Sequence, residues 1–403
     1  MQIHRRVAVL AAFFSLIPAL GLAQETRAEI ARKEREQKSA NLKPYVPNRI
    51  EATLFRIEDR YLMERIFNPP RGLFVRFGGM PQGAGLAAGP AYRRSNHLYN
   101  ATVTSAVSLR RYWEVTGSFA LPHLAGDRAS LAFVARRRSL PQEDFFGLGP
   151  GTAEDDQTSF ALKETSIALE ASASPTDWFR LSGAIGRESP RVSPGKDRRF
   201  PSIEQQFTDA VAPGLIVQPD FLRARVGAVL DVADRALGPP AGGVYAASYD
   251  VYRDRDRGQY SFNQWTVDLR QYVPLVRGAR SLVFRGFATG VRPDAGNEVP
   301  FFYQPTLGGP YSVRSMVAYR LRDRSALLLQ AEYRFELNAF MTGAVFYDAG
   351  NVAARARDFR LRSMRHDAGF GLRFGFMSRV SLRTEIAYGS EGPKLIFKFG
   401  DVF

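Results

Sequence analysis

The sequence contains no cysteine, so disulfide bonds, thiolate metal sites and thiol catalysis are excluded. Histidine is also scarce, with 4 in the whole chain. Neither a Gly-x-Ser-x-Gly nucleophile turn nor a His-Glu-x-x-His zinc motif occurs, and no pairing of a nucleophile with a base is visible. We therefore expect a protein that is not an enzyme and that holds no metal or cofactor.

Acidic residues are outnumbered by basic ones. Lys and Arg together number 55 and Asp and Glu 40, so the formal charge is 55 − 40 = +15. Such an excess suits nucleic acid or the phosphates of lipopolysaccharide equally well. The chain shows no basic helix, RNA-binding aromatic signature or zinc-finger spacing, so we do not expect nucleic acid as a partner. The expected partners are outer-membrane lipid and lipopolysaccharide.

Long apolar runs are missing except at the N-terminus. Arg5 and Arg6 precede an apolar stretch over 7–22, and the small residues Gly21 and Ala23 stand before a cleavage site. This pattern predicts a signal peptide over 1–23. The alternative, an uncleaved anchor, would need the ~20 apolar residues that span a bilayer. A secreted chain with amphipathic strands is either a soluble periplasmic β-protein or an outer-membrane barrel.

The segment 24–70 differs from the rest of the chain. Residues 24–42 are charged on every side and predict a solvated spacer. Residues 49–67 predict an amphipathic helix, because apolar residues recur at helical spacing before Pro69 and Pro70 end it. We expect this periplasmic helix to pack in the barrel mouth as a lumen plug; contact with the membrane surface or with a partner are the alternatives.

From Arg71 onward, apolar and polar residues alternate with the period of β-strands. The expected strands are 72–79, 84–94, 99–109, 112–121, 129–138, 158–172, 176–187, 221–232, 242–253, 258–272, 280–291, 325–337, 340–350, 365–376, 379–388 and 393–400. They number about sixteen, and bacterial outer-membrane barrels have an even number of strands. Most of their lengths suit tilted membrane strands of ~9–11 residues.

The connections between these strands alternate in length. The long ones are 139–157, 188–220, 292–324 and 351–364, whereas Ser174-Pro175 is typical of the short ones. Short periplasmic turns and long extracellular loops are expected of an outer-membrane barrel, and a soluble sandwich has no reason to show them. The predicted fold is therefore an all-β, transmembrane antiparallel β-barrel over 71–403 in the bacterial outer membrane.

The last predicted strand has a strongly apolar face. Leu395, Phe397 and Phe399 share that face, and the chain ends in Phe403. An amphipathic final strand with a terminal aromatic residue resembles the signal by which the barrel-assembly machinery recognises such barrels. The alternative is a plain edge strand, but an exposed apolar edge invites aggregation in a soluble protein.

Two acidic residues on neighbouring strands form the candidate site. A carboxylate that faces lipid costs up to ~2–4 kcal/mol, so Glu332 and Asp348 should face the lumen. Arginine is the best bidentate partner for a carboxylate, and Arg314 lies in the Gly-Gly-Pro loop just before them. We predict that Arg314 reaches into the lumen to meet both acids. Arg334 and Arg373 are competing cations, and a general lumen charge network is the alternative.

These residues resemble the BamA/TamA-type outer-membrane assembly and translocation barrels, which have sixteen strands. In that family the sixth extracellular loop folds into the lumen with a Val-Arg-Gly-aromatic motif. Its arginine binds an acid on strand twelve and the Asp of a Phe-x-Asp-x-Gly motif on strand thirteen. The resemblance gives these roles to the following residues: Val313 and Arg314 in the loop, Glu332 on strand twelve, and Phe346, Asp348 and Gly350 on strand thirteen. The chain departs from the loop motif at Ser315 and Met316.

Further segments extend the resemblance over roughly 71–403. The run 369–376 resembles the family's fourteenth strand and 394–403 its last, whereas 144–149 followed by Glu154-Asp155-Asp156 resembles the bacterial surface antigen subgroup. The resemblance implies insertion or translocation of substrates such as unfolded outer-membrane proteins or lipids through a lateral seam between 72–79 and 393–400. The segment 24–70 is too short for a POTRA domain, so we expect none there. The alternative function is a passive pore that favours anions, or a structural outer-membrane protein.

Overall fold

The computed structural model describes residues 69–234, 241–276, 280–338, 341–376 and 379–400. The predicted signal peptide, spacer and helix over 49–67 lie outside these ranges, as does Phe403. The chain separates into two units, 1–60 and 61–403, and all described residues belong to the second. No helix in the described ranges is long and apolar enough to cross a membrane.

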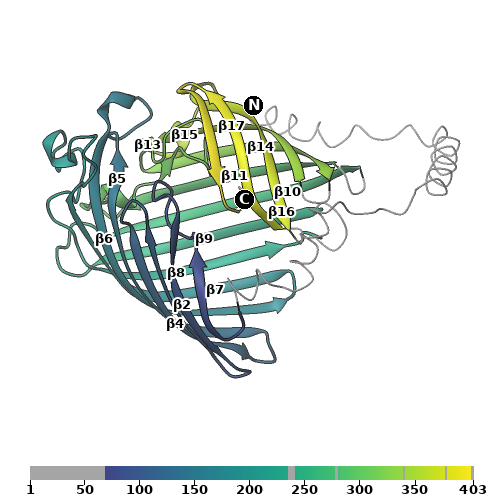
Figure 1. Ribbon diagram of the computed structural model, residues 1–403. Coiled ribbons are helices and arrows are strands. Elements are labelled where there is room, and N and C mark those ends of the chain that lie inside the picture. The colour runs from purple at the N-terminus through teal and green to yellow at the C-terminus, as the bar shows by residue number, and fades with distance from the viewer. Residues whose placement is uncertain (1–68, 235–240, 277–279, 339–340, 377–378, 401–403) are drawn as a thin grey trace, which may run out of the picture. The chain divides into compact units, whose positions relative to one another are not determined.

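Sixteen antiparallel strands form one sheet in which neighbours along the chain are also neighbours in space, which confirms the predicted fold class (Figure 1). The strands are β1 (Gly72–Phe77), β2 (Ala87–Ser95), β3 (Asn100–Ser108), β4 (Trp113–Leu124), β5 (Ala129–Phe145), β6 (Thr158–Thr176), β7 (Phe179–Pro194), β8 (Phe221–Asp231), β9 (Gly242–Asp254), β10 (Phe262–Val276), β11 (Arg280–Pro293), β14 (Ser325–Asn338), β15 (Met341–Ala353), β16 (Arg365–Phe376), β17 (Arg379–Gly389) and β18 (Gly392–Lys398). Two short strands, β12 (Thr306–Leu307) and β13 (Leu321–Arg322), pair with each other inside the long connection between β11 and β14. The sequence pattern did not predict this pair.

Several strands extend beyond their predicted ends. The pairing of β5 with β6 continues to Phe145 opposite Thr158, and β7 runs on to Pro194. The extended parts do not face lipid. Leu140 and Phe145, in the extended part of β5, are buried in an apolar cluster with Phe160 of β6 and with Phe301, which comes from the connection between β11 and β14. The sequence placed these strand ends too early because the cluster forms only when a distant loop covers them.

The two faces of the wall differ as the alternation predicts. On β15, Tyr347 is 49% exposed, whereas Phe346 and Asp348 are buried. On β18, Leu395 and Phe397 are exposed and Ile396 is buried. Exposed apolar side chains on one face and buried polar ones on the other correspond to the lipid and lumen faces of an outer-membrane barrel.

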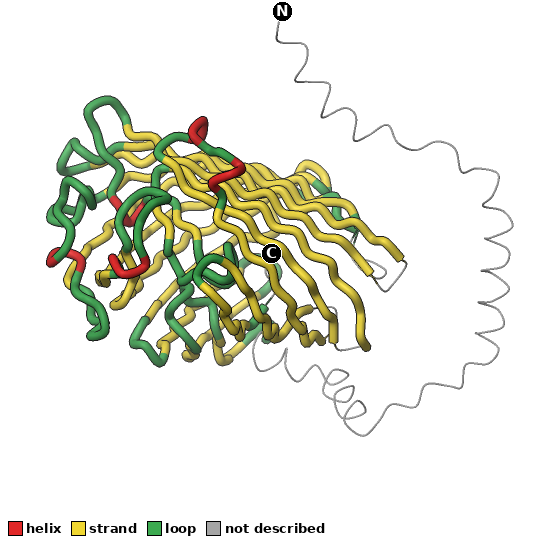
Figure 2. Tube along the Cα trace, turned by 90° about the horizontal axis from the view of Figure 1, so that it is seen from above, coloured by secondary structure: helices red, strands yellow, loops and turns green. Residues whose placement is uncertain are grey.

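The loops gather at one end of the strands (Figure 2). The long connections at this end are 146–157, 195–220, 294–324 and 354–364. At the edges of the sheet, the rings of Phe77, the last residue of β1, and Phe399, which follows β18, meet edge to face with centroids 5.1 Å apart. The sheet therefore curls round until its first and last strands meet, and this meeting line is called the seam below.

Candidate functional site

The connection over 294–324, called the lumen loop below, turns back on itself where the sequence predicts a fold-back. Gly308 and Gly309 adopt positive φ angles of 113° and 93°, which favour glycine. The Gly309 N–H donates to the Met316 carbonyl oxygen at 3.1 Å. Val313 and Met316 are buried in an apolar cluster with residues of β14 and β15. These contacts hold the tip of the loop so that Arg314, between them, points toward acidic side chains of the barrel wall.

Arg314 has no exposed surface and meets three carboxylates. Its Nε lies 2.6 Å from Asp348 Oδ2 and its Nη2 2.9 Å from Asp348 Oδ1, a bidentate pair. Its Nη1 lies 2.9 Å from Glu332 Oε1 and 3.1 Å from Glu385 Oε1. The guanidinium carbon stands 3.4 Å from the centroid of the Phe346 ring, a desolvated cation–π contact. Burial lowers the pKa of Arg314, but the three carboxylates outweigh it and raise this pKa above its ordinary value, so the side chain stays charged.

Further charged residues surround these contacts and balance them. Arg373 Nη2 lies 2.6 Å from Glu332 Oε1, and Arg383 Nη1 lies 2.6 Å from Glu385 Oε2. Asp367 Oδ2 accepts the Ser315 N–H at 2.5 Å. The arginine cluster, as it is called below, contains four arginines and four acids: Arg314, Arg334, Arg373, Arg383, Glu332, Asp348, Asp367 and Glu385. Buried charges of this kind are tolerated only when they are paired and hydrogen-bonded.

The strand register explains why these groups meet. Asp348 on β15 lies opposite Gln330 on β14, whose Nε2 donates to Asp348 Oδ1 at 2.9 Å. On β16, a Cβ at Gly369 would collide with the Phe346 ring, and one at Gly371 would come within 2.5 Å of Glu385 Cγ. The glycines of the run 369–376 therefore leave room for the ring on which Arg314 stacks and for the third acid that it meets.

The structure brings most of the expected site residues together. Val313, Arg314, Glu332, Phe346, Asp348 and Arg373 all lie in or against the arginine cluster. Gly350 lies under the loop, where a Cβ would approach Leu307 and Val313 at about 3 Å. Arg334 and Arg373 both pair with Glu332, alongside Arg314 rather than in its place.

Arg383, Glu385 and Asp367 also belong to this site, although their sequence pattern did not predict it. The signal for two of them was visible, because the alternation over 379–388 places Arg383 and Glu385 on the polar face. Nothing in that pattern indicates that the loop crosses to β17. Phe397 and Phe399, two residues of the predicted assembly signal, are exposed, whereas Ile396 on the opposite face of β18 is buried.

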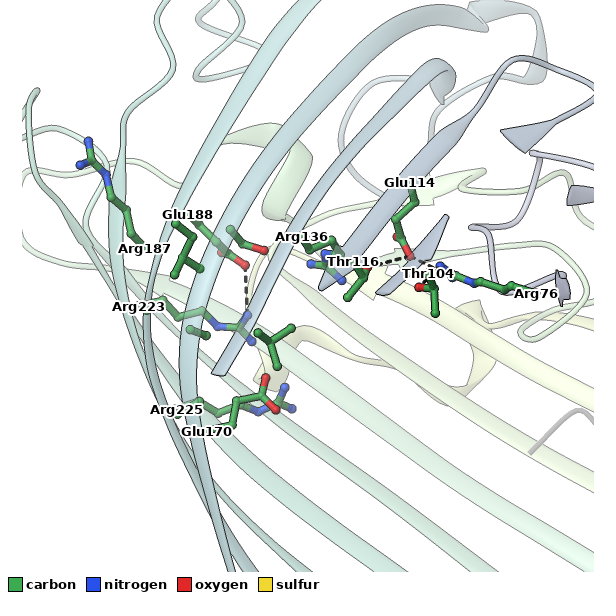
Figure 3. Close-up of a pocket in the computed structure, with 16 residues that line it drawn as sticks. Arg76, Thr104, Glu114, Thr116, Arg136, Glu170, Arg187, Glu188, Arg223 and Arg225 are labelled. Carbon is green, nitrogen blue, oxygen red and sulfur yellow. Dashed lines mark hydrogen bonds and ion pairs between the residues drawn. The ribbon is translucent and has the colours of Figure 1, made fainter. Parts of the chain in front are cut away.

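A second polar region lies on β1 and β3 to β8, around a cavity of about 490 Å³ (Figure 3). Arg76 Nη2 lies 2.9 Å from Glu114 Oε1, and Arg223 Nη1 lies 3.1 Å from Glu188 Oε1. The other arginines that line the cavity also lie in ion pairs: Arg136, Arg187 and Arg225. Each of these arginines therefore has an acidic partner, but Glu164, Asp220 and Asp250 are each shared by two arginines.

Comparison with known proteins identifies the fold. A model of the Omp85 superfamily domain matches residues 99–400. No curated protein matches the sequence. A structure of BamA from Haemophilus ducreyi lacking POTRA domains 1-3 superposes with a TM-score of 0.62 at 13% identity, covering 82% of this chain and 70% of that one.

Two structures of CdiB are also similar. The protein from Escherichia coli superposes with a TM-score of 0.52 at 13% identity, covering 89% of this chain and 69% of that one. The protein from Acinetobacter baumannii gives 0.51 at 15% identity, covering 81% of this chain and 58% of that one. At these identities the likeness establishes the fold of the barrel.

Proposed function

This chain belongs to the Omp85 superfamily, and on that premise we propose that it inserts or translocates protein or lipid at the outer membrane through the seam between β1 and β18. The barrel is an outer-membrane protein. Its proposed substrates are unfolded outer-membrane proteins or lipids, which would leave the lumen sideways into the bilayer.

The shortness of the seam strands is the observation that carries this proposal. β1 has 6 residues and β18 has 7, whereas β5 has 17 and β6 has 19. The number of ladder hydrogen bonds between two strands rises with their paired length. A seam formed by the shorter strands is therefore weaker than the β5–β6 ladder, and it is the place where the wall opens at least cost.

The lumen loop supports a lateral route. Arg314 binds β14, β15 and β17 through buried ion pairs, and the Ser315 N–H binds Asp367 of β16 through a hydrogen bond, so the loop holds these four strands together while the seam opens. Removing one partner of a buried ion pair typically costs ~3–5 kcal/mol, so thermal motion rarely releases the loop. For a substrate in the lumen, the seam is then easier to open than the strands that the arginine cluster holds together.

Outer-membrane lipid and lipopolysaccharide are the proposed partners of the positively charged connection between β15 and β16. The connection between β15 and β16 carries the exposed arginines Arg355, Arg357, Arg360 and Arg362 with one acid, Asp358. Arg357 and Asp358 are 4.0 Å apart and both largely exposed, so this pair leaves most of the positive charge available. Phosphate groups in the outer leaflet would neutralise that charge.

Locking the seam tests the proposed function. Cysteines replace Phe77 and Phe399, whose rings touch, and a cleavable bifunctional thiol reagent joins them in a chain that has no native cysteine. A matched control joins Phe133 and Leu169, which are paired across the long β5–β6 ladder and both exposed. Growth and outer-membrane composition are compared before and after the linker is cleaved.

The proposal predicts a defect with the seam lock that cleavage reverses, and no defect with the control lock. Efficient cross-linking at the seam without any defect would refute opening of the seam. Steady ion conductance that is insensitive to the lock would then identify a passive pore.

A further inference from the structure

A second arginine of the lumen loop joins three connections at the outer end of the barrel. Arg320 is 4% exposed. Its Nη2 and Nη1 donate to the carbonyl oxygen and Oγ1 of Thr152 at 2.6 and 2.9 Å. Its guanidinium lies 4.9 Å from the ring centroid of Phe146, and its Nε lies 2.8 Å from Glu391 Oε1. Thr152 and Phe146 belong to the β5–β6 connection, whereas Glu391 lies in the turn between β17 and β18.

The turn at Glu391 is fastened to the lumen loop by more than this ion pair. Glu391 Oε2 accepts the Val317 N–H at 3.2 Å, and Lys394 Nζ donates to the Met316 carbonyl oxygen at 2.8 Å. All these contacts involve the hairpin of β17 and β18, whose second strand is one edge of the seam. The other attachment of Arg320 is to β5 and β6, which lie far from this hairpin in the sheet order. Arg320 therefore ties the seam edge to the long central strands.

We propose that Arg320 and Glu391 form a latch that favours the shut seam, and that separation of this ion pair weakens the attachment that keeps β18 at β1. This latch rests on the proposed function and would control when the seam opens. Arg314 cannot serve this purpose, because it meets three acids that are completely buried. Glu391 is a single acid whose side chain is 11% exposed, so water can reach it.

The geometry also lets the latch close again. When Glu391 moves away, Arg320 keeps both hydrogen bonds to Thr152 and its contact with Phe146. A side chain held in one orientation loses little conformational entropy when the acid returns. The retained contacts therefore leave the cation in place for the returning hairpin.

The test measures the rate at which cysteines at positions 77 and 399 are cross-linked in lipid vesicles. Glu391→Gln removes the charge with little change of shape, and Arg320→Ala removes the cation. Each variant is expected to raise the ratio of open to closed seam roughly tenfold, which corresponds to a coupling of about 1.4 kcal/mol between Arg320 and Glu391. Because positions 77 and 399 separate when the seam opens, cross-linking should become slower. The double variant should show no further increase in this ratio, because both changes break the same contact. Arg357→Ala, at an exposed ion pair on the same end of the barrel, is the matched control and should change nothing.

An unchanged cross-linking rate in folded Glu391→Gln would overturn the latch, as would fully additive effects of the two changes. If Arg320→Ala fails to fold, Glu391→Gln alone decides. The outcomes separate the two proposals. If the seam lock impairs growth but Glu391→Gln leaves cross-linking unchanged, the latch is refuted and the proposed function is supported. If Glu391→Gln opens the seam but the lock is harmless, the latch stands and the proposed function falls.

Discussion

Replacing Arg314 by alanine is the sharpest test of the arginine cluster. The three acids that meet Arg314 are not affected equally. Glu332 keeps Arg334 and Arg373, and Glu385 keeps Arg383. Asp348 loses both hydrogen bonds of its bidentate pair and keeps no cation among the described ion pairs, although the Gln330 amide still donates to it. The cost is therefore mainly that of one uncompensated buried carboxylate.

We expect Arg314→Ala to lower the free energy of unfolding by about 3–5 kcal/mol, the usual cost of removing one partner of a buried ion pair. The double variant that also carries Asp348→Asn should be more stable than Arg314→Ala alone, because the uncompensated charge is gone. This sign separates electrostatics from packing, since a packing defect would grow with the second substitution.

The assay is urea unfolding of the barrel in lipid vesicles, followed by tryptophan fluorescence, together with the heat-dependent shift in gel mobility of folded barrels. Arg357→Ala is the control, because an exposed pair of this kind contributes at most about 1 kcal/mol. The reasoning is refuted if Arg314→Ala unfolds at the same urea concentration as the unchanged protein, or if Asp348→Asn makes it less stable still.

Three further predictions follow from the same contacts. Gly350→Ala should cost about 1–3 kcal/mol, because the new methyl group crowds Val313 under the lumen loop, whereas Gly117→Ala has open space and should cost far less in the same unfolding assay. The loss caused by Arg314→Ala should persist in 1 M salt, because a buried pair is screened much less than an exposed one; disappearance of the loss would place the cluster in contact with solvent. Phe397→Ser should reduce the fraction of newly made chain that reaches the outer membrane, measured by pulse-chase fractionation, whereas unchanged delivery would remove Phe397 from the assembly signal.

The alternation of apolar and polar residues predicts much of the fold. Alternation over 325–337 and 340–350 predicts which side chains face the lumen, and burial of Glu332 and Asp348 agrees with it. A strand register is coupled to this pattern, since a slip of one residue would turn every apolar side chain to the wrong face. The outer ends of β5 and β7 could not be predicted, because they are buried by the lumen loop and not by lipid.

The sequence by itself determined the sixteen strands, their lumen and lipid faces, and the choice of Arg314, Glu332 and Asp348 as candidate partners. Only the tertiary structure decided that Glu385 completes the arginine cluster and that Arg320 reaches both Thr152 and Glu391. The physical reason is that the alternation of apolar and polar residues carries information about one strand only. Periodicity reports which face a side chain takes within its own strand, whereas the path of a long loop across the lumen depends on contacts with strands far away along the chain.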